Sequence, residues 1–213
     1  MEINNKDLIS SFLQFNEDTF YFIQVIQRRK DNPELDKAEL QRGFWFIRSL
    51  GDLDIHWPKI LMLCNTYNAR AYISLNPRSL SRLGKLALHN LAERNIKNAW
   101  DGVERVMQKI ALIPETRQEG LLFSKTWIID LDTDDIKELE LIKNSLMCLS
   151  DFKIHTIIPT PNGYHLVTGS FNKYGLDSIS DYSDKNWNYV MSGIPFSVKR
   201  EANTLLYSNL QKP

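Results

Sequence analysis

Two aspartates at the end of an apolar run are the first residues whose types and spacing could do chemistry. The run at 127–129 leads into Asp130 and Asp132, with Leu131 between them. Side chains alternate along a β-strand, so the two aspartates would share one face while Leu131 points into a core. Neighbouring carboxylates repel each other unless a cation lies between them, and oxygen ligands favour Mg²⁺ or Mn²⁺ over Zn²⁺. The spacing indicates a divalent-metal site or, alternatively, a strand end followed by helix-capping acids.

A histidine directly after a glycine turn is the second candidate. In the segment from Thr160 to His165, the pair Asn162-Gly163 is a strong hairpin signal. A glycine in such a turn lets a phosphate approach the backbone closely. On the strand that follows, His165 would share its face with Gly163 and Val167. The alternative is a core histidine that is hydrogen-bonded to a neighbour.

Arginines flank a third segment, at residues 68–78. On a strand at 69–75, the side chains of Arg70, Tyr72 and Ser74 would line one face. Arg78 follows a rigid Asn-Pro turn at the exit of that strand, where a guanidinium suits bidentate contact with a phosphate. The alternative for Arg78 is a surface arginine that forms a salt bridge with a loop.

Further basic residues gather near the expected strand ends and turns. Such a cluster could follow the backbone of a nucleic-acid strand, although a charged run can equally be a solvated edge. Trp187 and Tyr189, in a polar segment, could stack on bases or fold back onto the core. The basic candidates are Arg28, Arg29, Lys30, Arg48, Arg70, Arg78, Arg82 and Lys85.

The composition restricts the classes of protein that fit. The 213 residues are enough for one sizeable core or two small lobes sharing a cleft. With 26 basic and 26 acidic residues, any nucleic-acid surface must be a local patch. Cys64 and Cys148 make neither a disulfide framework nor a thiolate zinc site, which fits a reducing compartment. Because we find no signal-peptide pattern and no apolar run near the roughly 20 residues that span a bilayer, we expect a cytoplasmic protein with no membrane partner.

Strands and helices must position these side chains. Strands are expected at 19–27, 43–50, 69–75, 125–131, 153–158, 164–167 and 204–207. Helices are expected at 5–14, 36–41, 54–67, 79–112 (interrupted) and 135–149, and the segment 172–193 is polar and irregular. Because strands and helices do not strictly alternate and hairpin signals come late, the pattern favours an α/β or α+β fold with a mixed sheet.

In this order, the three segments resemble the archaeo-eukaryotic primase superfamily, and most closely the primase–polymerase domains of plasmids and phages. That family places an Asn/Ala-Pro-Arg-like strand end before a hydrophobic-Asp-hydrophobic-Asp strand, and then a Ser/Thr-Gly-x-His turn. Here these motifs are Ala71 to Arg78, Ile128 to Asp132 and Thr160 to His165. The resemblance implies one domain over 1–213, with an N-terminal αβ unit at 1–68 and an RRM/palm-like catalytic core at 69–213.

The resemblance also implies a function, a divalent-metal-dependent nucleotidyltransferase. Asp130 and Asp132 would hold Mg²⁺ or Mn²⁺, and His165 would contact the phosphates of the incoming nucleotide. The expected partners are nucleoside triphosphates, a DNA or RNA template and a replicative helicase acting in trans, in phage or plasmid replication. The nucleotide-binding residues would be Arg78, Thr160, Asn162, Gly163 and His165.

The sequence departs from the family at one position. A third acid is expected near Ser197, which is not acidic, and Glu201 is close but out of phase. A two-metal site with only two carboxylates would be weakened, because each metal needs anionic ligands to offset its dehydration. Two alternatives therefore stay open, a catalytically degenerate nucleotide- or nucleic-acid-binding protein and a metal-dependent phosphodiesterase or nuclease.

Overall fold

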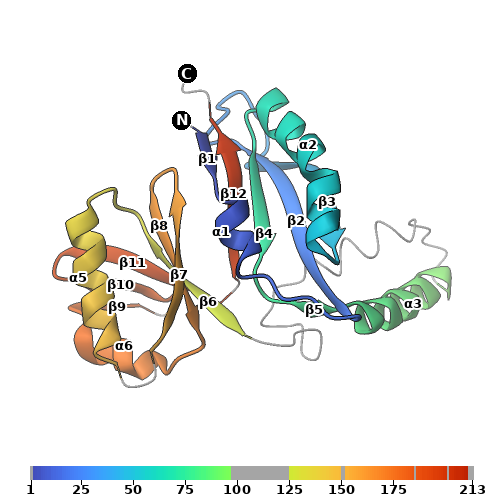
Figure 1. Cartoon of the computed structure of the whole chain (residues 1–213). Helices are drawn as coiled ribbons and strands as arrows, with labels where there is room; N and C mark the ends of the chain where they lie inside the picture. The colour runs from blue at the N-terminus through green and yellow to red at the C-terminus, as the bar shows by residue number, and fades with distance from the viewer. Residues whose placement is uncertain (1, 97–124, 150–151, 185, 201, 211–213) are drawn as a thin grey trace.

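Two antiparallel β-sheets stand side by side in the computed structural model (Figure 1), which describes residues 2–96, 125–149, 152–184, 186–200 and 202–210. Each sheet has six strands, and every strand pair is antiparallel. Five helices lie in the described part of the chain. The fold is therefore α+β, and its two antiparallel sheets correct the expectation of one mixed sheet.

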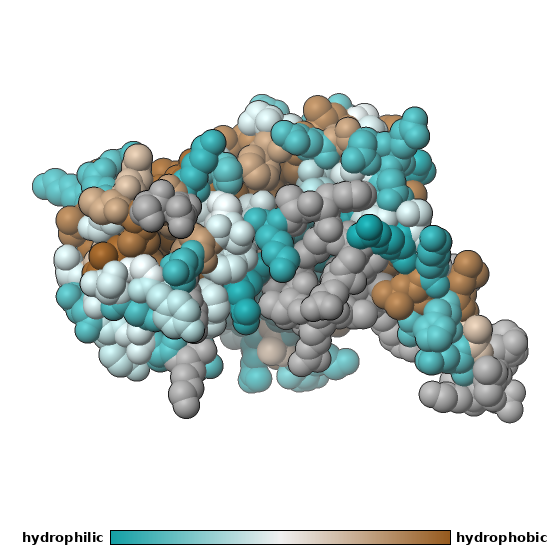
Figure 2. Space-filling model, turned by 90° about the horizontal axis from the view of Figure 1, so that it is seen from below, coloured by the Kyte–Doolittle hydropathy of each residue, from teal (hydrophilic) through white to brown (hydrophobic). Residues whose placement is uncertain are grey.

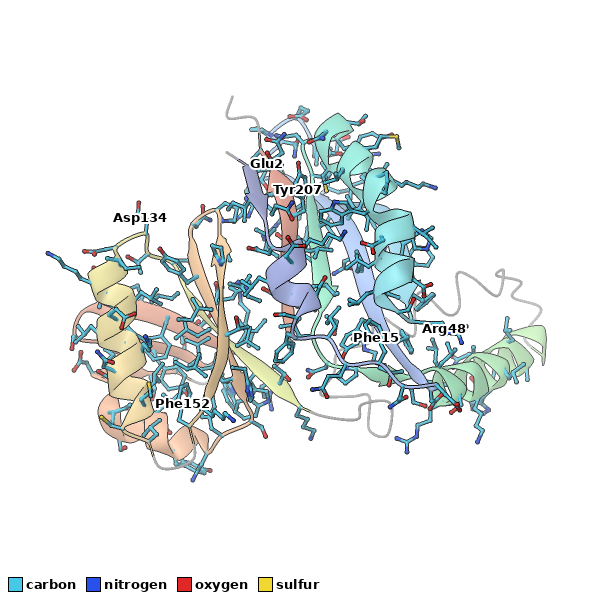
Figure 3. All side chains as sticks on the ribbon, viewed as in Figure 1. Glu2, Phe15, Arg48, Asp134, Phe152 and Tyr207 are labelled. Atoms are coloured by element: carbon cyan, nitrogen blue, oxygen red, sulfur yellow. The ribbon has the colours of Figure 1, made fainter. Side chains whose placement is uncertain are left out.

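The first sheet unites both ends of the chain. Its strand order is β1-β12-β4-β2-β3, with β5 paired to β2. On β2, alternate side chains such as Tyr21, Ile23 and Val25 are buried in a core that also receives residues of α1 (Lys6–Ser10) and α2 (Leu50–Thr66). The strands are β1 (Glu2–Asn4), β2 (Thr19–Arg28), β3 (Glu39–Ile47), β4 (Arg70–Ser74), β5 (Arg78–Ser79) and β12 (Asn203–Asn209). In Figure 3, Glu2 and Tyr207 mark the pairing of β1 with β12, which a hydrogen bond from the tyrosine hydroxyl to the carboxylate (3.1 Å) reinforces.

The second sheet has the strand order β7-β8-β6-β11-β10-β9. On β6, Ile129 and Leu131 are buried against Leu139 and Ile142 of α5 (Ile136–Met147), as the alternation predicted. Asp135 caps α5, because its side chain accepts a hydrogen bond from the amide of Lys137. The strands are β6 (Thr126–Leu131), β7 (Ile154–Thr160), β8 (Gly163–Gly169), β9 (Tyr182–Ser183), β10 (Asn188–Met191) and β11 (Ile194–Lys199), and α6 (Lys173–Ile179) precedes β9.

Two buried asparagines join the sheets. The amide nitrogen of Asn5 donates to the carbonyls of Pro159 and Leu205, both at 2.9 Å. Asn76 receives a hydrogen bond from the amide of Thr126 (2.6 Å) and donates to the carbonyl of the same residue (3.1 Å). The first core also includes Ile128, Ile158 and Val167 of the second sheet. Apolar packing and these hydrogen bonds together set the spacing between the sheets.

The structure corrects several expected elements. Residues 39–41 belong to β3 rather than to a helix at 36–41, because β2 keeps its pairing with β3 as far as Glu39. The first helix ends at Ser10, and the helix expected at 79–112 is described as α3 (Leu80–Ile96), with the rest outside the described residues. Strands β10 and β11 were not predicted.

The sheets divide the chain differently from the expected units at 1–68 and 69–213. Strands β4 and β12, expected in the second unit, pair within the first sheet. Seen from below, hydrophilic side chains are interspersed with apolar areas, one on the side of the second sheet and another at the α3 end (Figure 2). In the described ranges, the helices are too short or too polar to cross a membrane.

Candidate functional site

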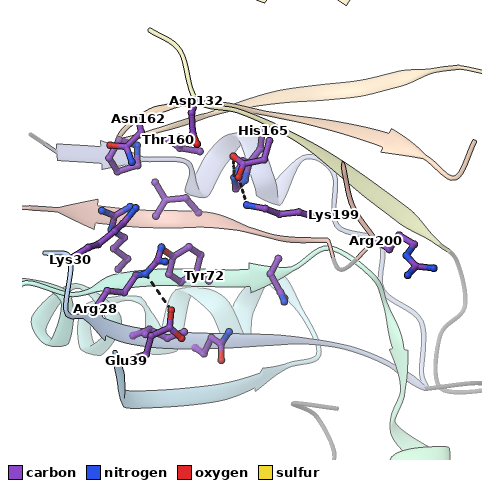
Figure 4. A pocket seen from close by; sticks show the side chains of 17 residues that line it. Arg28, Lys30, Glu39, Tyr72, Asp132, Thr160, Asn162, His165, Lys199 and Arg200 are labelled. Atoms are coloured by element: carbon purple, nitrogen blue, oxygen red, sulfur yellow. Dashed lines mark hydrogen bonds and ion pairs between the residues drawn. The ribbon is translucent and has the colours of Figure 1, made fainter. Parts of the chain in front are cut away.

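A cleft of about 530 Å³ lies between the two sheets (Figure 4). One wall comes from β2, β3, β4 and β12 of the first sheet, and the other from β6, β8 and β11 of the second sheet and from the β7–β8 turn. Both walls carry charge, so the cleft is polar where the sheets face each other. Apart from Tyr72, the charged or titratable residues that line it are Arg28, Lys30, Glu39, Arg70, Asp130, Asp132, His165, Lys199 and Arg200.

Asp130 lies at the centre of the second-sheet wall. Its neighbours across the sheet are His165 on β8 and Ser197 on β11. One carboxylate oxygen is 3.1 Å from Nε2 of His165, and the other forms an ion pair with the ammonium of Lys199. The side chain of Asp130 is only 16% exposed, so both oxygens interact with side-chain nitrogens in a partly desolvated setting.

The pKa of Asp130 is held well below its usual range. Burial alone would raise the pKa, because it disfavours the charged form. The hydrogen bond from His165 and the charges of His165 and Lys199 together outweigh the burial. Asp130 is therefore a carboxylate at any physiological pH, as a metal site would require.

His165 also spans the two sheets. Its Nδ1 lies 2.9 Å from the hydroxyl of Thr204 on β12, while its Nε2 faces Asp130. The ring is buried and still lines the cleft. Because partners on both sides fix the ring, His165 has a defined orientation toward the cleft.

Gly163 allows the hairpin to close against the end of β6. A Cβ atom at this position would lie 2.0 Å from the carbonyl oxygen of Leu131 and 2.7 Å from the amide nitrogen of Thr133. Its φ of +156° also disfavours other residues. This close approach brings Thr160 and Asn162 to the part of the cleft where Asp132 lies (Figure 4).

The first-sheet wall carries three basic side chains. Arg70 is buried and holds Asp31 through two hydrogen bonds of 2.5 and 2.7 Å. Arg28 donates to the hydroxyl of Tyr72 (3.3 Å) and pairs with Glu39 (3.3 Å). Burial and the nearby positive charges lower the pKa of Lys30. Three cations and two carboxylates leave this wall with a positive excess.

The structure brings most of the predicted site residues together, but not all. Arg78 is buried on β5 opposite Phe20, outside the cleft lining. Arg29 and Arg82 are exposed and do not line the cleft. Arg48, labelled in Figure 3, lies in a separate shallow pocket at the start of α2. The predicted residues that line the cleft are Arg28, Lys30, Arg70, Asp130, Asp132, Thr160, Asn162 and His165.

Lys199 is the main residue that sequence reasoning missed. Ile194, Phe196 and Val198 are buried, so alternation along β11 turns Ser197 and Lys199 to the face that carries Asp130. This alternation of apolar and polar residues at 194–199 was the sequence signal that could have predicted the strand and the position of Lys199. Ser197 lies directly opposite Asp130, where the resemblance led us to expect a third acid, while Glu201 lies outside the described residues.

The two loop aromatics belong to the second core rather than to an open stacking surface. Tyr189 is buried and stacks on Phe196, with ring centroids 5.4 Å apart. Trp187 packs edge-on against Trp127, and the guanidinium of Arg200 lies 4.7 Å from its ring centroid. Of the two interpretations that the sequence left open, stacking on bases and folding back onto the core, the structure shows the second for both residues.

The donor set suits one divalent cation better than two. No cluster of three or more His, Cys, Asp or Glu side chains able to hold a metal occurs among the described residues. Mg²⁺, however, commonly binds through one or two carboxylates and completes its shell with water and substrate phosphates. Asp130 and Asp132 line the same cleft and fit that requirement. A second metal would need an acid where Ser197 stands.

Comparisons of the chain with protein-family models, with curated proteins and with solved structures find no match. The chain is therefore classified by its fold and its cleft alone. It is an α+β protein in which two antiparallel sheets enclose a charged cleft, with an aspartate–histidine–lysine cluster on one wall and a basic wall opposite.

Proposed function

We propose that the cleft is the active site of a primase–polymerase-like nucleotidyltransferase, which adds nucleotides to a nucleic-acid strand with Mg²⁺ or Mn²⁺. The observation that carries the proposal is the meeting of Asp130, Asp132 and His165 in one cleft that a basic wall faces. Two aspartates suit a metal and a basic wall opposite them suits phosphates, and phosphoryl transfer needs both kinds of group close to the reacting phosphate. The second sheet would be the palm-like core.

Each wall would have its own part in the reaction. The carboxylates of Asp130 and Asp132 would hold the metal, which supplies charge neutralisation at the phosphates and activation of the attacking hydroxyl. His165, whose two ring nitrogens face Thr204 and Asp130, would hold the Asp130 carboxylate in place beside the metal and the incoming nucleotide. Arg28 and Lys30 on the opposite wall would bind the remaining phosphates or the template backbone.

A second function from a different class also has an observation in its favour. Ser197 stands opposite Asp130, and Lys199 already neutralises that aspartate. A cleft of this kind could bind nucleotides or nucleic-acid phosphates without transferring them. The chain would then be a degenerate binding protein of the same fold.

The cellular setting follows from the proposed reaction. Primer formation on a duplex needs the strands to be opened, so a replicative helicase acting in trans is the proposed partner. The proposed setting is the cytoplasm of a cell that carries a phage or plasmid. Copurification with a helicase during phage infection or plasmid replication would test this assignment.

A strand-extension assay separates the candidate functions. Labelled primers on DNA and RNA templates are incubated with dNTPs or NTPs and Mn²⁺, using wild type, Asp130→Asn and His165→Ala. Asp134→Asn is the matched control, because Asp134 lies in the loop before α5 (Figure 3) and outside the cleft lining. Extension that Asp130→Asn loses and Asp134→Asn keeps supports the transferase.

Other outcomes of the same assay point elsewhere. Nucleotide binding without extension supports the degenerate binding protein. Degradation of the labelled strand without added nucleotides indicates a phosphodiesterase or nuclease. Extension that Asp130→Asn retains at the wild-type rate would remove Asp130 from the proposed active site.

A further inference from the structure

Lys199 occupies a position from which it controls access to Asp130. Its ammonium pairs with one carboxylate oxygen, while His165 takes the other. Both oxygens are therefore engaged by side chains of the protein itself. A divalent cation can reach Asp130 only by displacing one of these two partners.

The two partners differ in how readily they can leave. The ring of His165 is buried, and Thr204 holds it from the opposite side. The side chain of Lys199 is 46% exposed, against 16% for Asp130, and its ammonium ends a flexible four-carbon stem. Lys199 can rotate into the cleft without disturbing the sheet, whereas His165 cannot.

We propose that Lys199 is a built-in cation that competes with divalent metal for Asp130 and, once displaced, binds the phosphates of the substrate. This inference rests on the proposed function in taking Asp130 as a metal ligand. The displaced ammonium would remain in the cleft, which Asn203 also lines. Metal and a phosphate-bearing substrate would then bind cooperatively, because each stabilises the arrangement that the other needs.

Metal titrations without nucleotide test the competition directly. Mn²⁺ binding is followed by electron paramagnetic resonance for wild type, Lys199→Met and Lys199→Arg. Removing the competing charge should tighten Mn²⁺ binding by about tenfold or more, while Lys199→Arg should stay near wild type. Lys143→Met is the matched control, because Lys143 pairs with Glu140 (3.0 Å) on the exposed face of α5.

The double variant Lys199→Met/Asp130→Asn should lose the gained affinity, which assigns the gain to this carboxylate. Lys199→Gln replaces Lys199→Met if the latter fails to fold in a thermal melt. Equal or weaker Mn²⁺ binding by the uncharged variants, or no binding by any variant, overturns the inference. The strand-extension assay is run separately on the wild type, so failure of the proposed function is recognised independently of the metal titrations.

Discussion

Arg70 and Arg28 line the same wall of the cleft but are held very differently. The side chains of Arg70 and Asp31 are only 6% and 10% exposed, and they form a bidentate pair. Arg28 is a third exposed and has weaker, longer contacts with Tyr72 and Glu39. Arg70 therefore serves mainly to join β4 to the turn after β2, while Arg28 is better placed to meet a ligand.

Replacing Arg70 by methionine should destabilise the fold strongly. The variant leaves the carboxylate of Asp31 poorly solvated and unpaired, which costs about 3–5 kcal/mol in the free energy of unfolding. Urea denaturation measures the loss. Arg29→Ala, at an exposed site, should change it by less than about 0.5 kcal/mol. An Arg70→Met protein as stable as wild type would contradict a structural role for this ion pair.

Asp130 should make the stability depend on pH in the acid range. Its pKa is lower in the folded protein than in the unfolded chain, so its contribution is complete above the unfolded value of about 3.9. As the pH falls below that value the contribution is progressively lost. We expect the difference in unfolding free energy between wild type and Asp130→Asn to shrink from pH 5 to pH 3. Histidines of the unfolded chain stay protonated throughout this range, so they do not contribute to the change. A difference in unfolding free energy that stays the same from pH 5 to pH 3 would refute the assignment to Asp130.

At the scale of single elements, the junction of β6 with the β7–β8 hairpin decides whether the site forms. Gly163 packs against the backbone where β6 ends, and a Cβ atom would not fit there. The position of Thr160 and Asn162 in the cleft therefore depends on a glycine at residue 163. The Asn-Gly signal predicted the turn from sequence alone. The contact with Leu131 was not predictable, because it joins segments that are distant in the chain.

Gly163→Ala should lower the free energy of unfolding by more than about 3 kcal/mol, since backbone atoms would have to move to admit a methyl group. Gly84→Ala is the control, because Gly84 lies in α3 with open space where the methyl group would go, and alanine there should stabilise by about 0.5–1 kcal/mol. Thermal melts of both variants provide the comparison. Similar melting temperatures for the two would show that the junction tolerates a side chain.

The sequence predicted those elements whose signals are local. The apolar alternation of β6, the helix-capping acids after it, of which Asp135 is the cap, and the hairpin at Asn162-Gly163 each reside in a few adjacent residues. Strand β11 was missed although its residues alternate, because Pro195 lies within it and its partner β6 is far away in sequence. The salt bridge from Lys199 to Asp130 depends on that long-range pairing, so it was hidden as well.

At the scale of the whole molecule, the cleft exists because two sheets are fixed at one spacing. Asn5, Asn76 and the His165–Thr204 pair cross between them, and each is buried. The expected units at 1–68 and 69–213 did not predict two sheets joined in this way. Strands β4 and β12 come from the later part of the chain and complete the first sheet. Hydrogen bonds of single polar side chains, together with the shared apolar core, therefore maintain the distance between the two walls of the cleft.

Asn76→Ala should weaken this connection. The substitution removes both hydrogen bonds between Asn76 and Thr126. The buried backbone amide of Thr126 then loses the Asn76 oxygen that accepts from it, at a cost of about 1–3 kcal/mol in unfolding free energy. Urea denaturation gives the cost, and nucleotide affinity should fall as the walls lose their spacing. Asn65→Ala, which removes an exposed hydrogen bond to Asn209, should have little effect on either quantity. Unchanged stability of Asn76→Ala would show that apolar packing alone joins the sheets.

Isothermal titration of dNTPs and NTPs in the presence of Mn²⁺ tests the central claim most directly. Wild type is measured beside Asp130→Ala/Asp132→Ala, His165→Ala and the control Lys143→Ala. We predict metal-dependent binding that the control keeps and that both cleft variants lose, because Asp130 and Asp132 would hold the metal and His165 would hold Asp130 in place. No binding of any nucleotide by wild type would contradict the account, and the aspartate–histidine cluster would then be part of the scaffold that joins the two sheets.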